Sequence, residues 1–498
     1  MSILRGQWKA LPSLLLRMVT LFFRDVWFPP TLWLIKAEAT PLGSLAKALK
    51  VLPHLQSFQW FGLSPYLTWD IAEALAAYCP GLINLRLPRW VIYKSLIFSK
   101  AYPDAFYSSL SSDQPHLPIA LSGLQNLRSL SFVVIENVDD CPSKDVHFYS
   151  QDSRGWQGIA DLIAVNKSTL ETLTLPCDRI WDLPVRIFSF LTELDIVGSS
   201  VVESSELSGL DLICHHATNL QSLILRAEGD FGLFTILQDN SSALPCLISL
   251  KIISFVPLTE DLFRAVSQFI QGRPLLRRLD LSLNPVDWTT FASILPTIAD
   301  LEGLKVLGLT MPSTILTDDY RHVTQHLPDG LEAIRLKVNL SSPILDHGPL
   351  CVIVSYPFAP FKTWITDCNF FPFMQMQKLR QMPSLAFFSL HRYGSSKLYP
   401  FADDIAFDLK YLSLLYLDRN IWDIDRTGSE ITLSSWPILK KLVRMKEDFQ
   451  NEDAEWLLRH GDFPVCPLCV QSSHYDMIWI MFLHSRFFST DRARCWVS

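Results

Sequence analysis

The stretch AEALAAYCPGLINLRL, residues 72–87, contains the pattern that decides the fold. Its first half carries apolar residues at helical spacing and ends at Cys79 and Pro80, where the proline stops the helix. Its second half has the form L-x-x-L-x-L, with leucines at positions 82, 85 and 87. This alternation is typical of a strand that buries one face. The stretch therefore predicts a helix that turns sharply into a strand, with Cys79 as a small buried thiol at the corner.

The L-x-x-L-x-L pattern returns along most of the chain. Clear copies begin at Leu82, Leu127, Leu170, Leu191, Leu220, Leu247, Leu276, Leu304, Leu331, Leu385 and Leu412, and weaker copies begin at Leu55, Phe361 and Leu439. From Leu191 onward the copies are spaced by 24 to 30 residues. This regularity indicates an array of structural repeats. Two longer intervals hold insertions at about residues 88–118 and 134–154, which we expect to be loops.

Between the predicted strands, the apolar spacing changes to the helical period. Examples are residues 69–78, 156–166, 260–270 and 318–327, and Thr68, Thr259 and Thr317 stand where N-caps would. Each repeat therefore reads as a strand followed by a helix. Parallel strands joined by right-handed crossover helices bury one continuous core between a strand layer and a helix layer. The sequence predicts an α/β solenoid with a curved parallel sheet and outer helices.

Composition excludes several other classes of protein. The 498 residues are 49% hydrophobic and carry a formal net charge of -7, and no block of five like charges occurs. We therefore expect neither a disordered chain nor a nucleic-acid-binding protein. No uncharged apolar stretch of 18 residues or secretory signal is recognisable, so we expect no membrane contact and a cytoplasmic or nuclear location. The ten cysteines would then be reduced thiols.

The repeats resemble those of leucine-rich-repeat proteins, and the Cys-Pro corner resembles their cysteine-containing subtype. This likeness covers about residues 28–445 and implies a ribonuclease-inhibitor-like solenoid of about 13 repeats. The subtype is typical of F-box proteins, which are substrate receptors of cullin-type ubiquitin ligases. Because most corners diverge from the subtype, the chain looks most like the fungal members of that class.

An F-box would precede the repeats, begin with Leu-Pro and bind the ligase adaptor. Residues 1–27 match only the opening of that pattern, at Leu11, Pro12, Leu14, Leu15 and Leu16. A capping helix, a degenerate F-box and an incomplete N-terminus remain as alternatives. At the other end, residues 446–498 depart from the repeat period and are expected to form a C-terminal cap. There the acidic-fronted segment 451–460 predicts a helix that covers the edge of the last strand.

Motifs for catalysis or cofactor binding are lacking in the sequence. It has no phosphate-binding loop, no G-x-G-x-x-G after a strand, no H-E-x-x-H and no G-x-S-x-G, so we expect no enzyme activity and no cofactor. Cys214 beside His215 and His216 reads as a buried corner cysteine. Cys466 and Cys469 have metal-knuckle spacing, but zinc needs four ligands, and we expect a reduced pair there.

The solenoid would carry its function on the concave strand face. Because the leucines point inward, the residues that flank the second leucine and follow the third point to that face. The predicted partner-binding residues are Arg86, Glu193, Asp195, Arg226, Lys251, Arg278, Asp280, Arg335, Lys337, Phe387, His391 and Tyr416. Their basic middle and aromatic end would suit an acidic or phosphorylated peptide with an apolar anchor. The alternative is that these positions are polar only for solubility.

Two functions therefore follow from the sequence. In the first, the chain is a substrate receptor that binds a target on its concave face and the ligase adaptor through its N-terminus. In the second, it is a stand-alone scaffold that binds a protein partner and recruits no ligase.

Overall fold

The computed structural model divides the chain into two compact units. The first comprises Met1–Gln125, Phe132–Val165 and Asp462–Ser498, and the second comprises Asn126–Ser131 and Asn166–Gly461. The structure describes residues 46–59, 69–88, 121–133, 153–176, 183–197, 208–227, 232–312, 317–339, 377–393, 402–417, 420–427, 430–437, 449 and 452–458.

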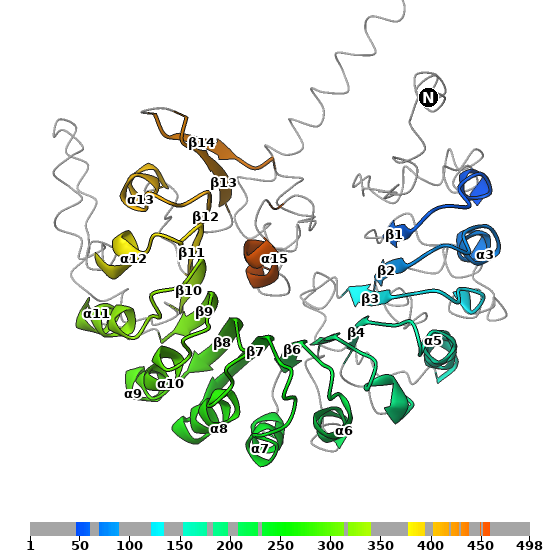
Figure 1. The fold of residues 1–498 in the computed structure, drawn as a ribbon, viewed down its shortest axis with the longest axis horizontal. Helices are drawn as coiled ribbons and strands as arrows, with labels where there is room; N and C mark the ends of the chain where they lie inside the picture. The colour runs from blue at the N-terminus through cyan, green and yellow to red at the C-terminus, as the bar shows by residue number, and fades with distance from the viewer. Residues whose placement is uncertain are drawn as a thin grey trace, which may run out of the picture. The chain divides into compact units, whose positions relative to one another are not determined.

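The first unit contains the stretch on which the prediction was based. Its described elements include β1 (Ser57–Gln59), α3 (Trp69–Tyr78), β2 (Asn84–Pro88) and α5 (Ser153–Val165). Strands β1 and β2 are parallel, and α3 connects them (Figure 1). The Cys79 side chain is fully buried at the corner, with Sγ 3.6 Å from the carbonyl oxygen of Leu52 and 3.8 Å from that of Leu49. The predicted helix, strand and buried thiol are confirmed.

The second unit is built on a series of parallel strands in chain order. They are β3 (Ser129–Val133, paired through residues 129–131), β4 (Thr172–Pro176), β5 (Glu193–Val197), β6 (Ser222–Ala227), β7 (Ser249–Leu258), β8 (Arg278–Pro285), β9 (Val306–Met311), β10 (Ala333–Asn339), β11 (Phe387–Tyr393) and β12 (Leu414–Leu417). Each strand pairs in parallel with the next. Parallel neighbours require crossover connections, and helices supply most of them.

The helices between these strands lie on one side of the sheet (Figure 1). They are α6 (Ser208–His216), α7 (Gly232–Asp239), α8 (Glu260–Ile270), α9 (Trp288–Ala292), α10 (Leu295–Ala299), α11 (Thr317–Gln325), α12 (Gln377–Gln381) and α13 (Ala402–Asp408), and the 3-10 helix η8 (Val185–Ile187) connects β4 to β5. In the described copies of this unit, the second apolar position of the motif, such as Leu250, Leu279 and Leu307, is fully buried. This open parallel sheet with alternating helices is a leucine-rich-repeat-type α/β solenoid, as predicted.

The parallel series ends in a hairpin that the repeat pattern did not indicate. Strand β13 (Asn420–Asp425) pairs antiparallel with β12, and β14 (Thr432–Ser435) pairs antiparallel with β13. Among the described strands, parallel pairing therefore stops at β12. The short, largely polar β14 gives this end of the sheet an edge that is poorly suited to further pairing.

Helix α15 (Glu452–Leu458) confirms the predicted helix but not its predicted position. The prediction placed it at the edge of the last strand, and this is wrong. It lies against β9 and β10, on the side of the sheet opposite the outer helices (Figure 1). We call that side of the second unit the inner face.

Several predictions refer to residues outside the described ranges. These are the N-terminal segment 1–27 with the possible F-box positions, almost all of both insertions, the repeat copies at Phe361 and Leu439, and the pair Cys466 and Cys469.

Candidate functional site

Helix α15 covers an apolar row on the inner face. Val306, Ala333, Phe387 and Leu414 stand at equivalent register positions on β9 to β12. They form one buried cluster with residues that include Ala454, Trp456 and Leu457 of α15. Strand positions that face solvent are usually polar, so this apolar row requires a cover. The apolar side of α15 provides that cover.

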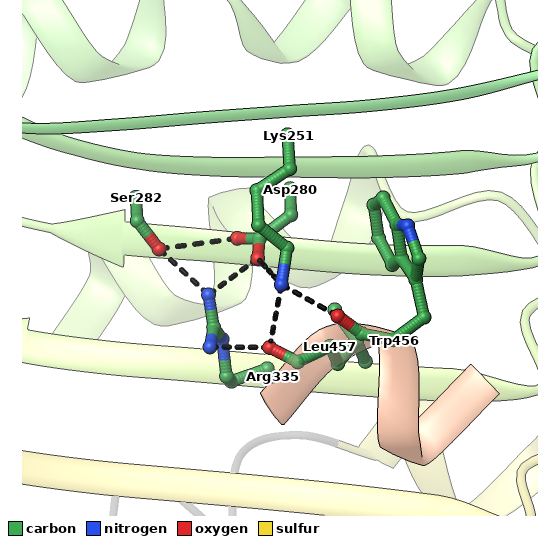
Figure 2. Close-up of polar contacts among 6 residues, drawn as sticks. All are labelled: Lys251, Asp280, Ser282, Arg335, Trp456 and Leu457. Atoms are coloured by element: carbon green, nitrogen blue, oxygen red, sulfur yellow. Dashed lines mark hydrogen bonds and ion pairs between the residues drawn. The ribbon is translucent and has the colours of Figure 1, made fainter. Parts of the chain in front are cut away.

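A network of buried charges lies beside the apolar row (Figure 2). Lys251 on β7 places Nζ 3.2 Å from Oδ2 of Asp280 on β8, and Arg335 on β10 places Nη2 2.5 Å from the same oxygen. Ser282 accepts from Nη2 of Arg335 at 2.7 Å and donates to Oδ1 of Asp280 at 3.1 Å. The side chains of Lys251, Asp280 and Arg335 have no exposed area. Pairing and hydrogen bonding offset the cost of burying these charges.

The same two cations bind the C-terminal end of α15 (Figure 2). Nζ of Lys251 donates to the carbonyl oxygens of Trp456 at 2.5 Å and Leu457 at 3.0 Å. Nη1 of Arg335 donates to the Leu457 carbonyl at 2.5 Å. The last carbonyls of a helix have no partner within it and carry its partial negative charge. Nζ of Lys251 also lies 4.8 Å from the centre of the Trp456 ring, in a cation–π contact.

Gly308 allows the charges to meet across an intervening strand. It stands on β9 opposite Asp280 of β8 on one side and Arg335 of β10 on the other. A Cβ atom at this position would lie 2.6 Å from Cγ of Asp280. The missing side chain therefore leaves the space in which the carboxylate and the guanidinium form their ion pair.

The N-terminal end of α15 is held by a second ion pair. Arg278 on β8 places Nε 2.7 Å and Nη2 2.6 Å from Oδ1 of Asp453. The first turn of α15 carries Glu452, Asp453 and Glu455. Acidic residues at the N-terminus and cations at the C-terminus both match the helix dipole. The inner face is thus complementary to both ends of the helix.

Asp280 is held in its ionised form. Burial alone would raise the pKa of its carboxyl group. The charges of Arg335, Lys251 and Lys337, with the hydrogen bond from Arg335, outweigh that effect and hold the pKa below its usual value. Because its folded pKa is lowered, the carboxylate contributes stability at pH values above its unfolded pKa. This contribution is lost as the pH falls through the folded pKa.

The predicted partner-binding residues are distributed unevenly over the structure. The buried network contains Lys251, Asp280 and Arg335, and Lys337 is buried near them. Arg278 pairs with Asp453. The apolar cluster includes Phe387 and Tyr416. Asp195 and Arg226 are buried on β5 and β6, and Glu193 is half-buried on β5. Arg86 is half-buried on β2 in the first unit, and the side chain of His391 on β11 lies outside the described part. Within the basic middle, α15 contacts Lys251, Arg278 and Arg335. Because Lys251 and Arg335 are fully buried, the sequence-based expectation that these two side chains are exposed is wrong.

The cysteine beside the histidine pair is also accounted for. Cys214 is a free, buried thiol at the end of α6, as predicted. Burial, with a smaller contribution from Asp211, raises the pKa of its thiol to about 12. Nδ1 of His215 lies 2.8 Å from the carbonyl oxygen of Asp211. A thiol with such a pKa is almost entirely protonated at neutral pH and is a poor nucleophile.

The part of the chain that the structure describes contains no group of three or more His, Cys, Asp or Glu side chains that could hold a metal ion. Its helices include none with the length and apolar character needed to span a membrane.

Comparison with known proteins adds a likeness to a solved structure. No family model and no curated protein matches the chain. The solved structures that match include the leucine-rich-repeat-containing protein LegL7 from Legionella pneumophila, which is 13% identical, with a TM-score of 0.35. The match covers 61% of this chain and 88% of that one. The strand order and register of the chain itself define its solenoid fold.

Sequence reasoning missed two parts of this site, the helix α15 and Gly308. It placed Lys251, Asp280 and Arg335 on one face from strand alternation alone, but it did not identify α15 as their partner. It also passed over Gly308, although a glycine at an outward position of a strand signals a close approach. The apolar residues Val306 and Ala333 at outward positions were the available signal that another segment covers this face.

Proposed function

We propose that the chain is a protein-binding scaffold and that its inner strand face holds the partner. The observation that supports this proposal is the docking of α15, because the face binds this helix through apolar and charged contacts that a partner helix can also make. An apolar row, a cation pair directed at helix carbonyls and Arg278 together hold an amphipathic helix. Hydrophobic grooves in other proteins likewise bind the apolar face of an amphipathic helix.

Affinity purification of the full chain tests this function. Two variants alter the inner face, namely Glu193→Arg on β5 and Arg278→Glu on β8. The control, Arg264→Glu, alters an exposed side chain on outer helix α8. We expect proteins that co-purify with the wild type to be retained by the control and lost from at least one face variant. Equal recovery on all three variants would place the partner elsewhere and exclude this function for the inner face.

The finer proposal is that the scaffold is a substrate receptor of a cullin-type ubiquitin ligase in the cytoplasm or nucleus. Its support is the resemblance at the Cys79–Pro80 corner and the Leu11–Pro12 opening, which lies outside the described residues. We expect the ligase adaptor and cullin to co-purify with the full chain and to be lost after Leu11→Ala and Pro12→Ala. If they are absent from the wild-type purification, the stand-alone scaffold is the remaining alternative.

A further inference from the structure

We propose that α15 is an exchangeable occupant of the inner face, and that the site recognises the C-terminal end of an acidic amphipathic helix supplied by a partner protein. This inference deepens the proposed function and rests on it. The site consists of Lys251, Asp280, Gly308 and Arg335, together with Arg278 and the apolar row of Val306, Ala333, Phe387 and Leu414.

Recognition at this site is directed mainly at the helix end and not at polar side chains. Lys251 and Arg335 donate to backbone carbonyls that every helix presents at its C-terminus. Such contacts can be reproduced by any helix that ends at this point. Sequence preference comes from two further contacts, the Trp456 ring beside Lys251 and the Asp453 carboxylate on Arg278. A partner helix would therefore need an acidic residue three positions before an aromatic residue, with apolar residues following.

The charged part of the site is suited to exposure as well as to burial, whereas the apolar row needs the cover of α15 or of a partner helix. If α15 left, Lys251, Asp280 and Arg335 would regain water and keep their mutual ion pairs, so opening would leave no stranded charge. A floor made only of apolar side chains would strongly disfavour opening. The burial of three ionised groups gives little net stability, which makes a charged floor a weak means of permanent attachment.

The occupant is also short. Helix α15 has seven residues, and isolated helices of this length are unstable in water. Its docking therefore includes the entropic cost of forming the helix, which lowers the net affinity of the contact. A longer partner helix with the same end chemistry is more helical before binding and bears less of that cost. It can displace α15.

A binding measurement on the full chain tests exchange. The probe is a fluorescent synthetic peptide of residues 449–461 with an amidated C-terminus, so that its end offers carbonyls and no carboxylate. The receptor is either the wild type or the vacated variant, in which Asp453→Ala and Trp456→Ala weaken the docking of α15. Because a docked α15 reduces the fraction of competent sites, we expect the peptide to bind the vacated variant at least about ten-fold more tightly than the wild type. A folded vacated variant that binds no peptide would overturn the inference.

A charge reversal establishes where the peptide binds. Arg278→Glu in the vacated variant should weaken binding of the natural peptide by about ten-fold. A peptide that carries Asp453→Arg should restore the affinity. Arg264→Glu on the outer side of the sheet is the matched control and should change neither result. If Arg264→Glu weakens binding as much as Arg278→Glu does, the peptide binds through general charge attraction, and the inference fails.

Amide hydrogen exchange on the wild type keeps the inference testable if the vacated variant does not fold. We expect the amides of α15 to exchange faster than those of β8, because the helix leaves the face without unfolding of the sheet. If α15 exchanges only together with β8, it is a fixed part of the core, and the inference is wrong. The purification experiment is independent, since a partner that depends on Glu193 would support the scaffold function even if the peptide fails to bind.

Discussion

The ion pair between Asp280 and Arg335 depends on the absence of a side chain at Gly308. Replacing it with alanine would force the Asp280 carboxylate away from the added methyl group and out of its ion pair. We expect Gly308→Ala to lower the free energy of unfolding by roughly 1–3 kcal/mol, the usual range for overpacking. The amides of α15 should also lose protection, because the displaced network no longer holds its carbonyls. Urea denaturation and hydrogen exchange measure the two effects.

Gly330 supplies the control for that substitution. It lies in the same unit, and an added Cβ would lie 3.5 Å from Nζ of Lys305 and 4.0 Å from the carbonyl oxygen of Leu304, both ordinary contact distances. Gly330→Ala should therefore leave α15 protected. If both variants behave alike, the space at Gly308 is not what positions the network.

The cysteines offer a second test at the scale of single residues. Burial raises the pKa of the Cys79 thiol to about 11. Burial, with a smaller contribution from Asp211, raises the pKa of the Cys214 thiol to about 12. Cys246 is only partly buried. Because the thiolate is the reactive form, a maleimide at pH 7.5 should label Cys246 at least about ten-fold faster than Cys79 or Cys214. Peptide mapping by mass spectrometry resolves each site. Equal labelling in the native protein would contradict the burial of the two corner thiols.

At the scale of elements, the repeat strands could be predicted and the position of α15 could not. Each L-x-x-L-x-L motif packs on its neighbours in the array, so local spacing determines the strand and its buried face. The partners of α15 are distant in sequence, since Lys251 and Trp456 are separated by 205 residues. Alternation placed Lys251, Asp280 and Arg335 on one face correctly. It cannot distinguish a polar side chain in water from one covered by a remote helix.

Helix capping gives a testable contrast between two neighbouring elements. Both Thr259 at the start of α8 and Asp287 at the start of α9 stand at the N-cap, but only Asp287 makes the side-chain bond, in which Oδ1 accepts from the Thr290 amide at 2.8 Å. We expect Asp287→Ala to lower the unfolding temperature more than Thr259→Ala does. The hydrogen bond from the Thr290 backbone is the main cause that lowers the pKa of Asp287.

The pH dependence of stability tests whether the charge of the Asp287 carboxylate acts in this cap. Because the folded pKa of Asp287 is lowered, its stabilising effect is present above its unfolded pKa and is lost as the pH falls through the folded value. Thermal unfolding followed by circular dichroism should show the difference between the wild type and Asp287→Ala at pH 7 and show it shrinking in strong acid. A difference that does not change with pH would mean that the carboxylate charge has no part in the cap.

At the scale of the whole molecule, we expect a destabilising substitution in the second unit to affect mainly the neighbouring strands. In a repeat array each repeat contacts only its neighbours, so stability is the sum of repeat and interface contributions. Leu279 on β8 is fully buried, and Leu279→Ala should cost about 2–5 kcal/mol. Leu275, four residues earlier, is 52% exposed, and Leu275→Ala should change stability by less than about 0.5 kcal/mol.

Hydrogen exchange should show the loss of protection from Leu279→Ala concentrated in β7, β8 and β9 and small in β4. An equal loss from β4 to β12 would mean that the strands unfold as one cooperative body, and α15, which bridges β7, β8 and β10 through Lys251, Arg278 and Arg335, would be the element that couples them.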